Sequence, residues 1–380
     1  MENRNWKEFY IEDFAEIVNH KRIPLSTLER TNRKGSFPYY GASGIIDYVD
    51  NYIFEGKHIL VSEDGENLRS RNTPIAFQAD GRFWVNNHAH ILKCKKDFYN
   101  EILIYYFQNL DLNPFLTGAV QPKLNKASLT KIPIILPADE NHQKAIASVL
   151  SSLDDKIDLL HQQNQTLEAL AETLFRQWFI EEAKEDWEDC TIEDLAIHSK
   201  ISVHPNRNPD TLYHHYSIPA FDANKKPVVE LGKEIQSNKY KVEENSILFS
   251  KLNPHKDKRV WLIQDNVEEH AICSTELQVV KPKDKDYLYF IYGWLTNSIY
   301  YNEIASGVGG TSGSHQRIEP KAIFTAPCVK IEKDIIFQYN SHAEPLFKKQ
   351  YENQQQIQTL TKLRDTLLPK LMSGEVKVKN

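Results

Sequence analysis

Apolar residues recur at alternating intervals of three and four positions through the middle of the chain, from Asp139 to Glu182, a stretch without proline or glycine. This spacing is typical of a helix that packs one edge against another helix. The recurring positions are Leu153, Ile157, Leu160, Asn164, Leu167, Ala171, Leu174 and Trp178. They predict a helix about 38 Å long from Leu153 to Trp178, at about 1.5 Å per residue. A long core helix inside one globular domain is the alternative interpretation.

The end of the chain repeats this pattern. Gln165-Thr166-Leu167 returns 193 residues later as Gln358-Thr359-Leu360. The second series consists of Leu346, Gln350, Asn353, Ile357, Leu360, Arg364, Leu367 and Leu371. Polar residues stand at different levels of the two aligned series, because Asn353 aligns with Leu160 and Ile357 aligns with Asn164. We expect the two helices to pair, with the polar residues specifying the orientation. The predicted contact residues are Leu153, Ile157, Leu160, Leu167, Leu174, Leu346, Ile357, Leu360, Leu367 and Leu371.

The repeat extends into the regions that precede the helices. Ile59–Ser62 matches Ile247–Ser250 at an offset of 188, and the pattern that starts at Gln121 matches the one at His315 at an offset of 194. Offsets that grow along the chain indicate an internal duplication with loop insertions in the second copy. The predicted organisation is therefore a globular unit at 1–138, a helix region at 139–186, a second globular unit at 187–332 and a second helix region at 333–380.

Short strand-like segments bounded by turn residues fill both globular units. In the first unit they are 45–49, 58–62, 75–78, 83–85 and 89–92, followed by a helix at 100–109. In the second they are 228–231, 246–250, 260–263 and 277–280, with a helix near 287–297. The fold class is therefore α+β, with two tandem mixed domains, each followed by a long helix. Glycine-rich loops are expected at 37–44 and 307–317, where backbone can approach a partner closely.

Composition narrows the class of protein. No uninterrupted apolar run reaches about 18 residues, so no membrane span is expected. The N-terminus lacks the apolar core of a signal peptide. Four scattered cysteines, Cys94, Cys190, Cys273 and Cys328, favour a reduced, cytoplasmic protein. The net charge of −6 argues only weakly against nucleic-acid binding, because charge distribution matters more than the sum.

Catalytic patterns are largely missing from the sequence. His88 and His90 have a spacing that can bind a metal, but no third ligand follows, so a polar or packing role is favoured over a metal site. The chain has 17 prolines but no Pro-Pro, which excludes the usual active-site motif of amine-modifying DNA methyltransferases. It also lacks a phosphate-binding glycine motif. The sequence therefore favours binding and positioning, with no catalytic residue, no metal and no cofactor of its own.

Several segments resemble a known family, the specificity subunits of type I restriction–modification systems. In the first copy they are YYGASGIIDYV (39–49), NNHAHIL (86–92) and GAVQPKLNKASLTKIPIILP (118–137). In the second they are ILFSKLNP (247–254), ICSTEL (272–277) and GTSGSHQRIEP (310–320). One departure lies at 138–143, where the family usually has a second proline and a Glu-Gln pair.

The resemblance implies a function and a set of partners. Each globular unit would be a target-recognition domain that reads one half of a split site in double-stranded DNA. The helices would pack antiparallel, hold the domains apart and recruit two modification subunits. Those subunits would carry S-adenosylmethionine and methylate adenine, and restriction subunits would complete the nuclease. No membrane association is implied.

The two copies share few loop residues, which predicts two different half-sequences. The residues expected to contact DNA in the first unit are Lys34, Tyr40, Ser43, Asn86, Asn87, His88, Gln121, Lys123, Asn125 and Lys126. In the second unit they are Ser250, Lys251, Asn253, Thr275, Thr311, Ser312, Ser314, His315, Gln316 and Arg317. A loop-structuring role is the alternative for each. Two other functions stay open: a stand-alone catalytic DNA methyltransferase or nuclease, and a coiled-coil assembly adaptor without a DNA role.

Overall fold

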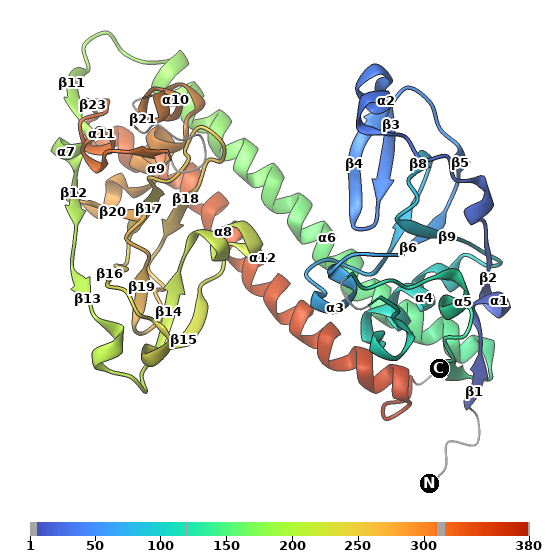
Figure 1. The fold of residues 1–380 in the computed structure, drawn as a ribbon. Coiled ribbons are helices and arrows are strands. Elements are labelled where there is room, and N and C mark those ends of the chain that lie inside the picture. The colour runs from blue at the N-terminus through green and yellow to red at the C-terminus, as the bar shows by residue number, and fades with distance from the viewer. Residues whose placement is uncertain (1–5, 119–120, 307, 310–315, 379–380) are drawn as a thin grey trace. The chain divides into compact units, whose positions relative to one another are not determined.

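The computed structural model describes residues 6–118, 121–306, 308–309 and 316–378. The chain forms two compact units (Figure 1). Unit 1 comprises Met1–His161 together with Gln355–Asn380, and unit 2 comprises Gln162–Gln354. Each unit thus contains one globular part and one half of each long helix. The domain boundaries drawn from the sequence follow the globular parts and stay predictions.

Unit 1 is built from two small sheets and one covering helix. One sheet has the order β2-β9-β6-β7 and the other β4-β3-β8-β5, while β1 pairs with β10. The strands are β1 Trp6–Phe9, β2 Ala15–Ile17, β3 Lys34–Gly41, β4 Gly44–Val49, β5 Phe54–Glu55, β6 His58–Ser62, β7 Ala76–Ala79, β8 Arg82–Val85, β9 Ala89–Cys94 and β10 Ile134–Pro137. The helices are α1 Ile11–Phe14, α2 Thr27–Asn32, α3 Asn67–Ser70, α4 Phe98–Asn109 and α5 Lys126–Leu129. All five strands and the helix predicted for this unit are confirmed to within a few residues.

Unit 2 repeats this plan with a larger second sheet. Its sheets have the orders β12-β20-β17-β18 and β13-β16-β19-β14-β15, while β11 pairs with β23 and β21 with β22. The strands are β11 Glu188–Thr191, β12 Ala196–Ser199, β13 Ser202–Val203, β14 Leu212–Tyr216, β15 Val228–Leu231, β16 Lys239–Lys241, β17 Ser246–Ser250, β18 Val260–Ile263, β19 Ala271–Cys273, β20 Leu277–Pro282, β21 Val308–Gly309, β22 Arg317–Ile318 and β23 Pro327–Lys330. The helices are α7 Ile192–Leu195, α8 Ile218–Asn224, α9 Leu288–Thr296, α10 Ser298–Ser306 and α11 Pro320–Phe324. The four predicted strands and the predicted helix are again confirmed.

Corresponding strands have corresponding partners in the two units, which supports the duplication. β6 pairs antiparallel with β9 as β17 does with β20. β3 pairs parallel with β8 as β14 does with β19. Strands that pair alike after an internal offset of 176 to 188 residues indicate one ancestral unit copied once.

The two predicted helices are α6 Glu140–Arg176 and α12 Lys333–Ser373. In unit 1, Ile157 and Leu160 pack with Ile357 and Leu360, and Arg364 donates to Asp154 at 2.7 Å. In unit 2, Asn353 donates to Asn164 at 3.0 Å. Partner numbers fall along one helix as they rise along the other, so the predicted antiparallel pairing is confirmed within each unit. α6 ends in a π-helical turn, Gln177–Glu181.

The polar residues of the two helices meet in the antiparallel pair. The sequence alignment places Asn164 and Asn353 at different levels, whereas the antiparallel pairing brings them face to face. The reason is that an alignment compares two helices in the same direction, while the pair runs in opposite directions. Asn353 is completely buried.

In unit 2, aromatic side chains of the two long helices pack into the hydrophobic core. Phe175 of α6 and Phe179 of the π-helical turn pack with Tyr339 of α12 and with Phe290 of α9. Gly293 of α9 permits this approach, because a Cβ there would lie 2.2 Å from the Phe175 ring. The heptad pattern did not predict Phe175 and Phe179, since they stand one position after the seam.

The prediction of a glycine-rich loop at 37–44 is wrong for most of this segment. Residues 37–41 belong to strand β3, which pairs with β4, and the turn is confined to Ala42 and Ser43. Alternating aromatic residues outweighed the glycines here, because Tyr39 is fully buried in the sheet. Most of the second expected loop lies outside the described residues. Over the described part of the chain, the longest helices are too polar to cross a bilayer.

Candidate nucleic-acid interface

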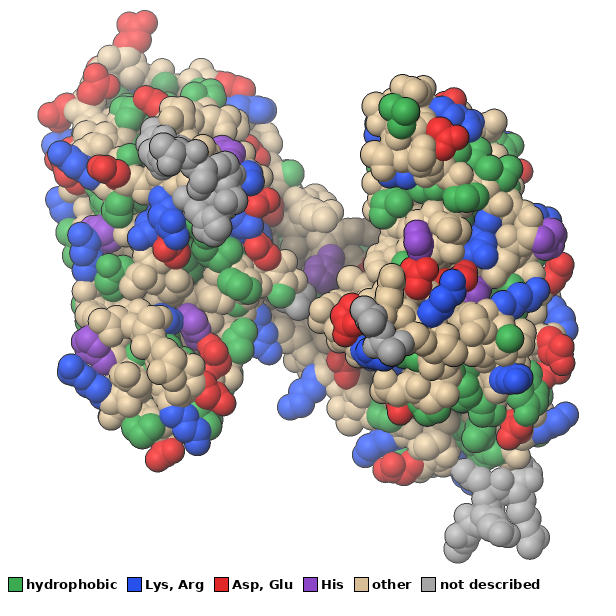
Figure 2. All heavy atoms as spheres, in the orientation of Figure 1, with side chains coloured by type: hydrophobic (Ala, Val, Ile, Leu, Met, Phe, Trp, Pro, Cys, Tyr) green, Lys and Arg blue, Asp and Glu red, His purple; other side chains and the backbone are tan. Residues whose placement is uncertain are grey.

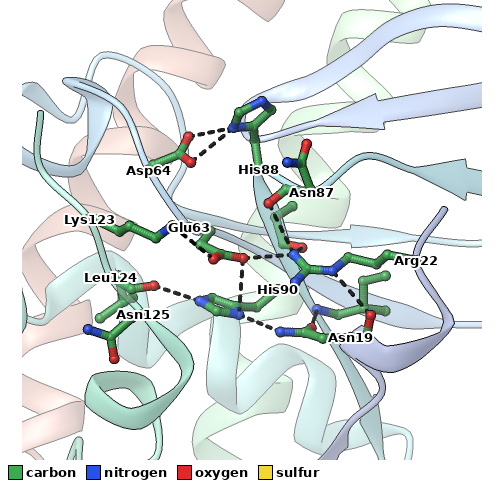
Figure 3. A network of polar contacts seen from close by, with 12 residues as sticks. Asn19, Arg22, Glu63, Asp64, Asn87, His88, His90, Lys123, Leu124 and Asn125 are labelled. Atoms are coloured by element: carbon green, nitrogen blue, oxygen red, sulfur yellow. Dashed lines mark hydrogen bonds and ion pairs between the residues drawn. The ribbon is translucent and has the colours of Figure 1, made fainter. Parts of the chain in front are cut away.

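Three segments of unit 1 that are far apart in sequence meet at one end of the β6–β9 pair (Figure 3). We call this place the first junction. It consists of Glu63 and Asp64 after β6, Asn87 and His88 before β9, and 121–125 before α5. Backbone hydrogen bonds hold it together: Glu63 N–H donates to His88 O at 2.8 Å, Leu124 N–H to Glu63 O at 2.8 Å, and Gly65 N–H to Pro122 O at 3.1 Å.

Glu63 lies at the centre of the charged groups of this junction. Its carboxylate accepts a hydrogen bond from Arg22 Nη1 at 2.7 Å, and Lys123 Nζ lies 3.6 Å from its other oxygen. Burial alone would raise the pKa of Glu63, but the Arg22 bond and the neighbouring His90, Arg22 and Lys123 lower it below the ordinary value. Glu63 therefore stays ionised and holds the two cations in place.

His88 presents one ring nitrogen outward. Its Nδ1 lies 2.8 and 2.9 Å from the two carboxylate oxygens of Asp64, so the carboxylate fixes the ring orientation. The side chain is half exposed, and Figure 3 shows the other ring nitrogen pointing away from Asp64. A nitrogen placed in this way can accept or donate a hydrogen bond to a ligand.

His90 has an internal role. It is fully buried, and its Nδ1 accepts from Asn19 Nδ2 at 2.7 Å while Nε2 donates to Leu124 O at 2.6 Å. Burial lowers the pKa of His90 below its ordinary value, so the ring is neutral and ties β9 to the segment before α5. The packing role favoured for this histidine over a metal site agrees with these contacts. Among the described residues, no cluster of His, Cys, Asp or Glu has metal-binding geometry.

The same construction occurs in unit 2, and we call it the second junction. Lys251 N–H donates to Glu276 O at 2.9 Å, Ile318 N–H to Lys251 O at 3.1 Å, and Asn253 N–H to Gln316 O at 2.8 Å. These three bonds correspond one for one to the three of the first junction. An isolated bridge between Leu252 and Arg317 also matches the one between Asp64 and Lys123.

The side chains at equivalent places differ between the junctions. Where unit 1 has Glu63, His88 and Lys123, unit 2 has Lys251, Glu276 and Arg317. Arg317 Nε bonds Glu276 at 3.0 Å, and Lys251 lies 4.0 Å from the same carboxylate. A cation before the short helix is thus kept in both units, while the carboxylate that holds it comes from a different strand.

Several residues expected to contact DNA present exposed side chains at the junctions. Asn87, His88, Gln121, Lys123 and Lys126 are exposed in unit 1, and Arg317 is exposed in unit 2. Lys251, Thr275 and Gln316 are partly exposed. Thr311, Ser312, Ser314 and His315 lie outside the described residues.

Other expected residues form hydrogen bonds within the junctions, and their contact with DNA stays a prediction. Ser250 is buried and accepts from Leu252 N–H at 3.3 Å. Asn86 is buried and accepts from His88 N–H at 2.8 Å. Asn125 caps α5 by accepting from Ser128 N–H at 2.9 Å. Asn253, in the left-handed region with φ 47°, accepts from Gln316 N–H at 3.0 Å. Amide and hydroxyl groups satisfied in this way order the loops.

The β3–β4 hairpin carries three further candidates. Lys34 forms an ion pair with Asp47 at 2.5 Å, and Ser43 is exposed at the turn. The half-buried Tyr40 ring packs against Phe77 and Phe83, and burial raises the pKa of its hydroxyl.

The hairpin turn also touches the first junction. The contact is made by Ser62 Oγ, which donates to Ala42 O at 2.6 Å. Because Ser62 precedes Glu63 and Ser43 follows Ala42 in the chain, the exposed Ser43 lies close to the first junction.

Sequence reasoning missed the acidic residues and Arg22. Asn19, Arg22, Glu63, Asp64 and Glu276 position the exposed groups but were not expected there, because a search for DNA contacts favours cations and amides. The aligned repeat offers a signal, since it places Glu63 against Lys251 and His88 against Glu276. On the face seen in Figure 2, acidic, basic and histidine side chains are interspersed, an arrangement that suits base edges better than a purely electrostatic grip on phosphates.

Comparisons with known proteins show which proteins this chain is similar to. The model of the type I restriction modification DNA specificity domain matches residues 3–169. A Haemophilus influenzae protein named as a type I restriction enzyme specificity subunit, S.HindORF215P, is 39% identical over 148 residues, which are 39% of this chain and 37% of that protein. The MjaIX specificity subunit of Methanocaldococcus jannaschii is 27% identical over 425 residues, covering 99% of this chain and 94% of the relative.

A solved structure shows the same fold. The S subunit of a type I restriction–modification system from M. genitalium superposes with a TM-score of 0.62 at 14% identity, over 98% of this chain and 97% of that one. In family model, in a relative aligned over nearly its whole length and in fold, this chain is similar to the specificity subunits of type I restriction–modification systems. The resemblance drawn from the sequence motifs is thereby confirmed.

Proposed function

We propose that each unit of this chain reads one half of a split, asymmetric site in double-stranded DNA. The observation that carries the proposal is the junction built twice on equivalent backbone hydrogen bonds but with different side chains. The shared backbone geometry places the exposed side chains in the same way in both units, and different side chains at these places select different bases. Glu63, His88 and Lys123 therefore belong to one half-sequence, and Lys251, Glu276 and Arg317 to the other.

We further propose that the helices recruit two copies of one partner, the modification subunit, and through them the restriction subunits. The support comes from the positions at which the two long helices have identical residues. Residues 162–174 and 355–367 share eight of thirteen positions. Six of the eight shared residues are exposed in α6 and five in α12.

Helix pairing alone does not account for this distribution. At the buried level the repeat has diverged, with Leu160 against Asn353 and Asn164 against Ile357. The exposed stripe Thr166-Leu170-Thr173 in unit 2 has the same residues as Thr359-Leu363-Thr366 in unit 1, and both leucines are about half exposed, at 51% and 44%. Two identical outward stripes fit two identical partners. The methyl donor S-adenosylmethionine would be bound by those partners.

The proposal is tested with the chain alone and with the modification subunit. The pure chain should not methylate DNA in the presence of S-adenosylmethionine, and the assembled complex should bind and methylate a specific duplex. The logarithm of the complex's affinity should fall linearly with the logarithm of salt concentration. Methylation by the rigorously pure chain would support a stand-alone enzyme, and salt-independent or absent DNA binding by the complex would support an adaptor.

A further inference from the structure

The two long helices are copies of each other, and such helices have a pairing problem. A second copy of α6 can in principle take the place of α12, and a second copy of α12 can take the place of α6. Either exchange would join two chains and separate the helices that belong together. The buried contacts of the pair show how the correct partner is selected.

Two adjacent layers of the pair have opposite character. In one, Leu160 packs with Ile357. In the next, Asn353 Nδ2 donates to Asn164 Oδ1 at 3.0 Å and lies 3.4 Å from Gln163 Oε1. Gln350 Nε2 also donates to Asn164 O at 3.1 Å. The repeat relates the two layers, because Leu160 corresponds to Asn353 and Asn164 corresponds to Ile357.

The exchange of one helix for its copy mismatches both layers. If a second α6 replaced α12, Leu160 would stand where Asn353 is and Asn164 where Ile357 is. Each Asn164 would then face a leucine. If a second α12 replaced α6, each Asn353 would face Ile357. Asn353 is buried and Asn164 is partly buried, and an amide shielded from water without a polar partner is costly. Both homotypic pairs are therefore disfavoured, while the α6–α12 pair matches like with like.

A slip in register is disfavoured for the same reason. Moving α12 by one heptad in either direction places Asn353 opposite Ile157 or Ala171. The same slip places Asn164 opposite Leu346 or Leu360. All four partners are apolar, so the native register alone lets the two asparagines meet. A single buried asparagine layer is a known means of fixing register and partner in paired helices, at a cost in stability.

That cost is visible in this chain. Asn353 is completely buried, and among the described residues its Oδ1 is one of the few buried side-chain oxygens without a hydrogen-bond donor. An aliphatic residue at 353 with another at 164 would pack without this defect. The amides are therefore poorly explained by stability.

We propose that the Asn164–Asn353 layer is a selection device that makes α6 pair with α12 of the same chain, in one register, against the homotypic pairing that the internal duplication would otherwise allow. An ion pair adds to it. Arg364 meets Asp154 in the native pair, whereas the residue that corresponds to Asp154 in the repeat is Phe347. Arg364 would lose its acidic partner in an α12–α12 pair.

The test compares three variants of the full chain with the wild type. Asn164→Leu leaves Asn353 without its main partner, Asn164→Leu/Asn353→Ile makes both layers apolar, and Gln162→Leu/Gln355→Leu adds apolar residues at repeat-equivalent exposed positions as the matched control. Tagged and untagged chains are refolded together, the tagged chain is captured, and the co-purified untagged chain is measured. Thermal unfolding is followed in parallel.

We expect the single variant to melt at a lower temperature than the wild type and the double variant to recover or exceed the wild-type value. The double variant should capture several-fold more untagged chain than both the wild type and the control, because the asparagine layer then no longer disfavours homotypic pairs. The proposal is overturned if the double variant captures no more than the wild type, or if the control captures as much. Neither readout requires DNA binding, so the result is independent of the function proposed above.

Discussion

The two junction cations offer a paired test of the division of labour between the units. Lys123 and Arg317 occupy equivalent positions, and both side chains are about half exposed. Truncating either to alanine leaves the nearby carboxylate paired: Glu63 keeps Arg22 at 2.7 Å, and Glu276 keeps Lys251 at 4.0 Å. Both variants should therefore fold, and their effects should report on recognition.

The expected magnitude depends on what each cation contacts. A lost base contact costs about 1–3 kcal/mol, or roughly 5- to 150-fold in affinity, and relaxes one position of one half-sequence. A lost phosphate contact weakens all sequences alike and reduces the salt slope by about 0.9. Arg317 has the planar fork that suits guanine, so Arg317→Ala is the stronger candidate for a base effect.

The assay measures affinity of the assembled complex for duplexes that carry single base changes in either half-site. Lys123→Ala should alter the response to changes in one half only, and Arg317→Ala in the other half only. Lys57→Ala is the control, because this exposed lysine lies at the opposite end of β6 from Glu63. If both variants altered the same half, or if neither differed from the control, the junctions would not be the reading sites.

Three further predictions follow from particular contacts. Gln163 and Asn353 lie opposite each other, and four residues inserted after each would lengthen both helices by about 6 Å. Since DNA rises about 3.4 Å per base pair, methylome sequencing should show a gap between the half-sequences that is one or two base pairs longer. An unchanged gap in an active complex would show that the helices do not set the gap. Asp154→Ala removes the acceptor of the buried Tyr105 hydroxyl at 2.6 Å and the acceptor of Arg364 on the other helix, which leaves Arg364 only Asp365 beside it. Denaturant unfolding should show a loss of about 2 kcal/mol, and a loss below about 0.5 kcal/mol would contradict this. Burial lowers the pKa of His90 from 6.5, so below about pH 6.5 the unfolded chain binds a proton at His90 more readily than the folded chain does. The free energy of unfolding should therefore fall as pH drops below about 6.5. His90→Gln should reduce that fall, measured by urea titrations at pH 7.5 and 5.5.

The parts of the fold that follow from periodicity were predictable. Between Ile157 and Ala171 the seam positions of α6 are less exposed than their neighbours. Strands β17 and β18 begin and end where the sequence indicates. The antiparallel arrangement of the helices was expected from the family resemblance, not from the repeat itself. The facing of Asn164 and Asn353 was not predicted, because it requires the register of the pair, which neither helix specifies alone.

The candidate site was predicted at the level of segments but not of individual roles. The segments around Asn86 and Lys123 come together in unit 1, and those around Lys251 and Arg317 come together in unit 2. Buried Asn86 and Ser250 nevertheless bond within their own loops. Asparagine and serine have the same donors and acceptors whether they order a loop or read a base, so the sequence does not distinguish the two. Glu63 and Glu276 were missed because they act indirectly, by positioning the exposed cations Lys123 and Arg317.

The central claim is that each unit reads its own half-sequence. It is tested most directly by replacing residues 1–138 with the equivalent region of a relative that has a different target and sequencing the methylome of cells that carry the chimera with its modification subunits. The donor should keep the apolar residues that pack on Ile146, Leu150, Leu368 and Leu371, since these helix residues belong to the core of unit 1. The account predicts that one half of the methylated sequence changes while the other half and the gap stay the same. A change in both halves, or in neither, would contradict it.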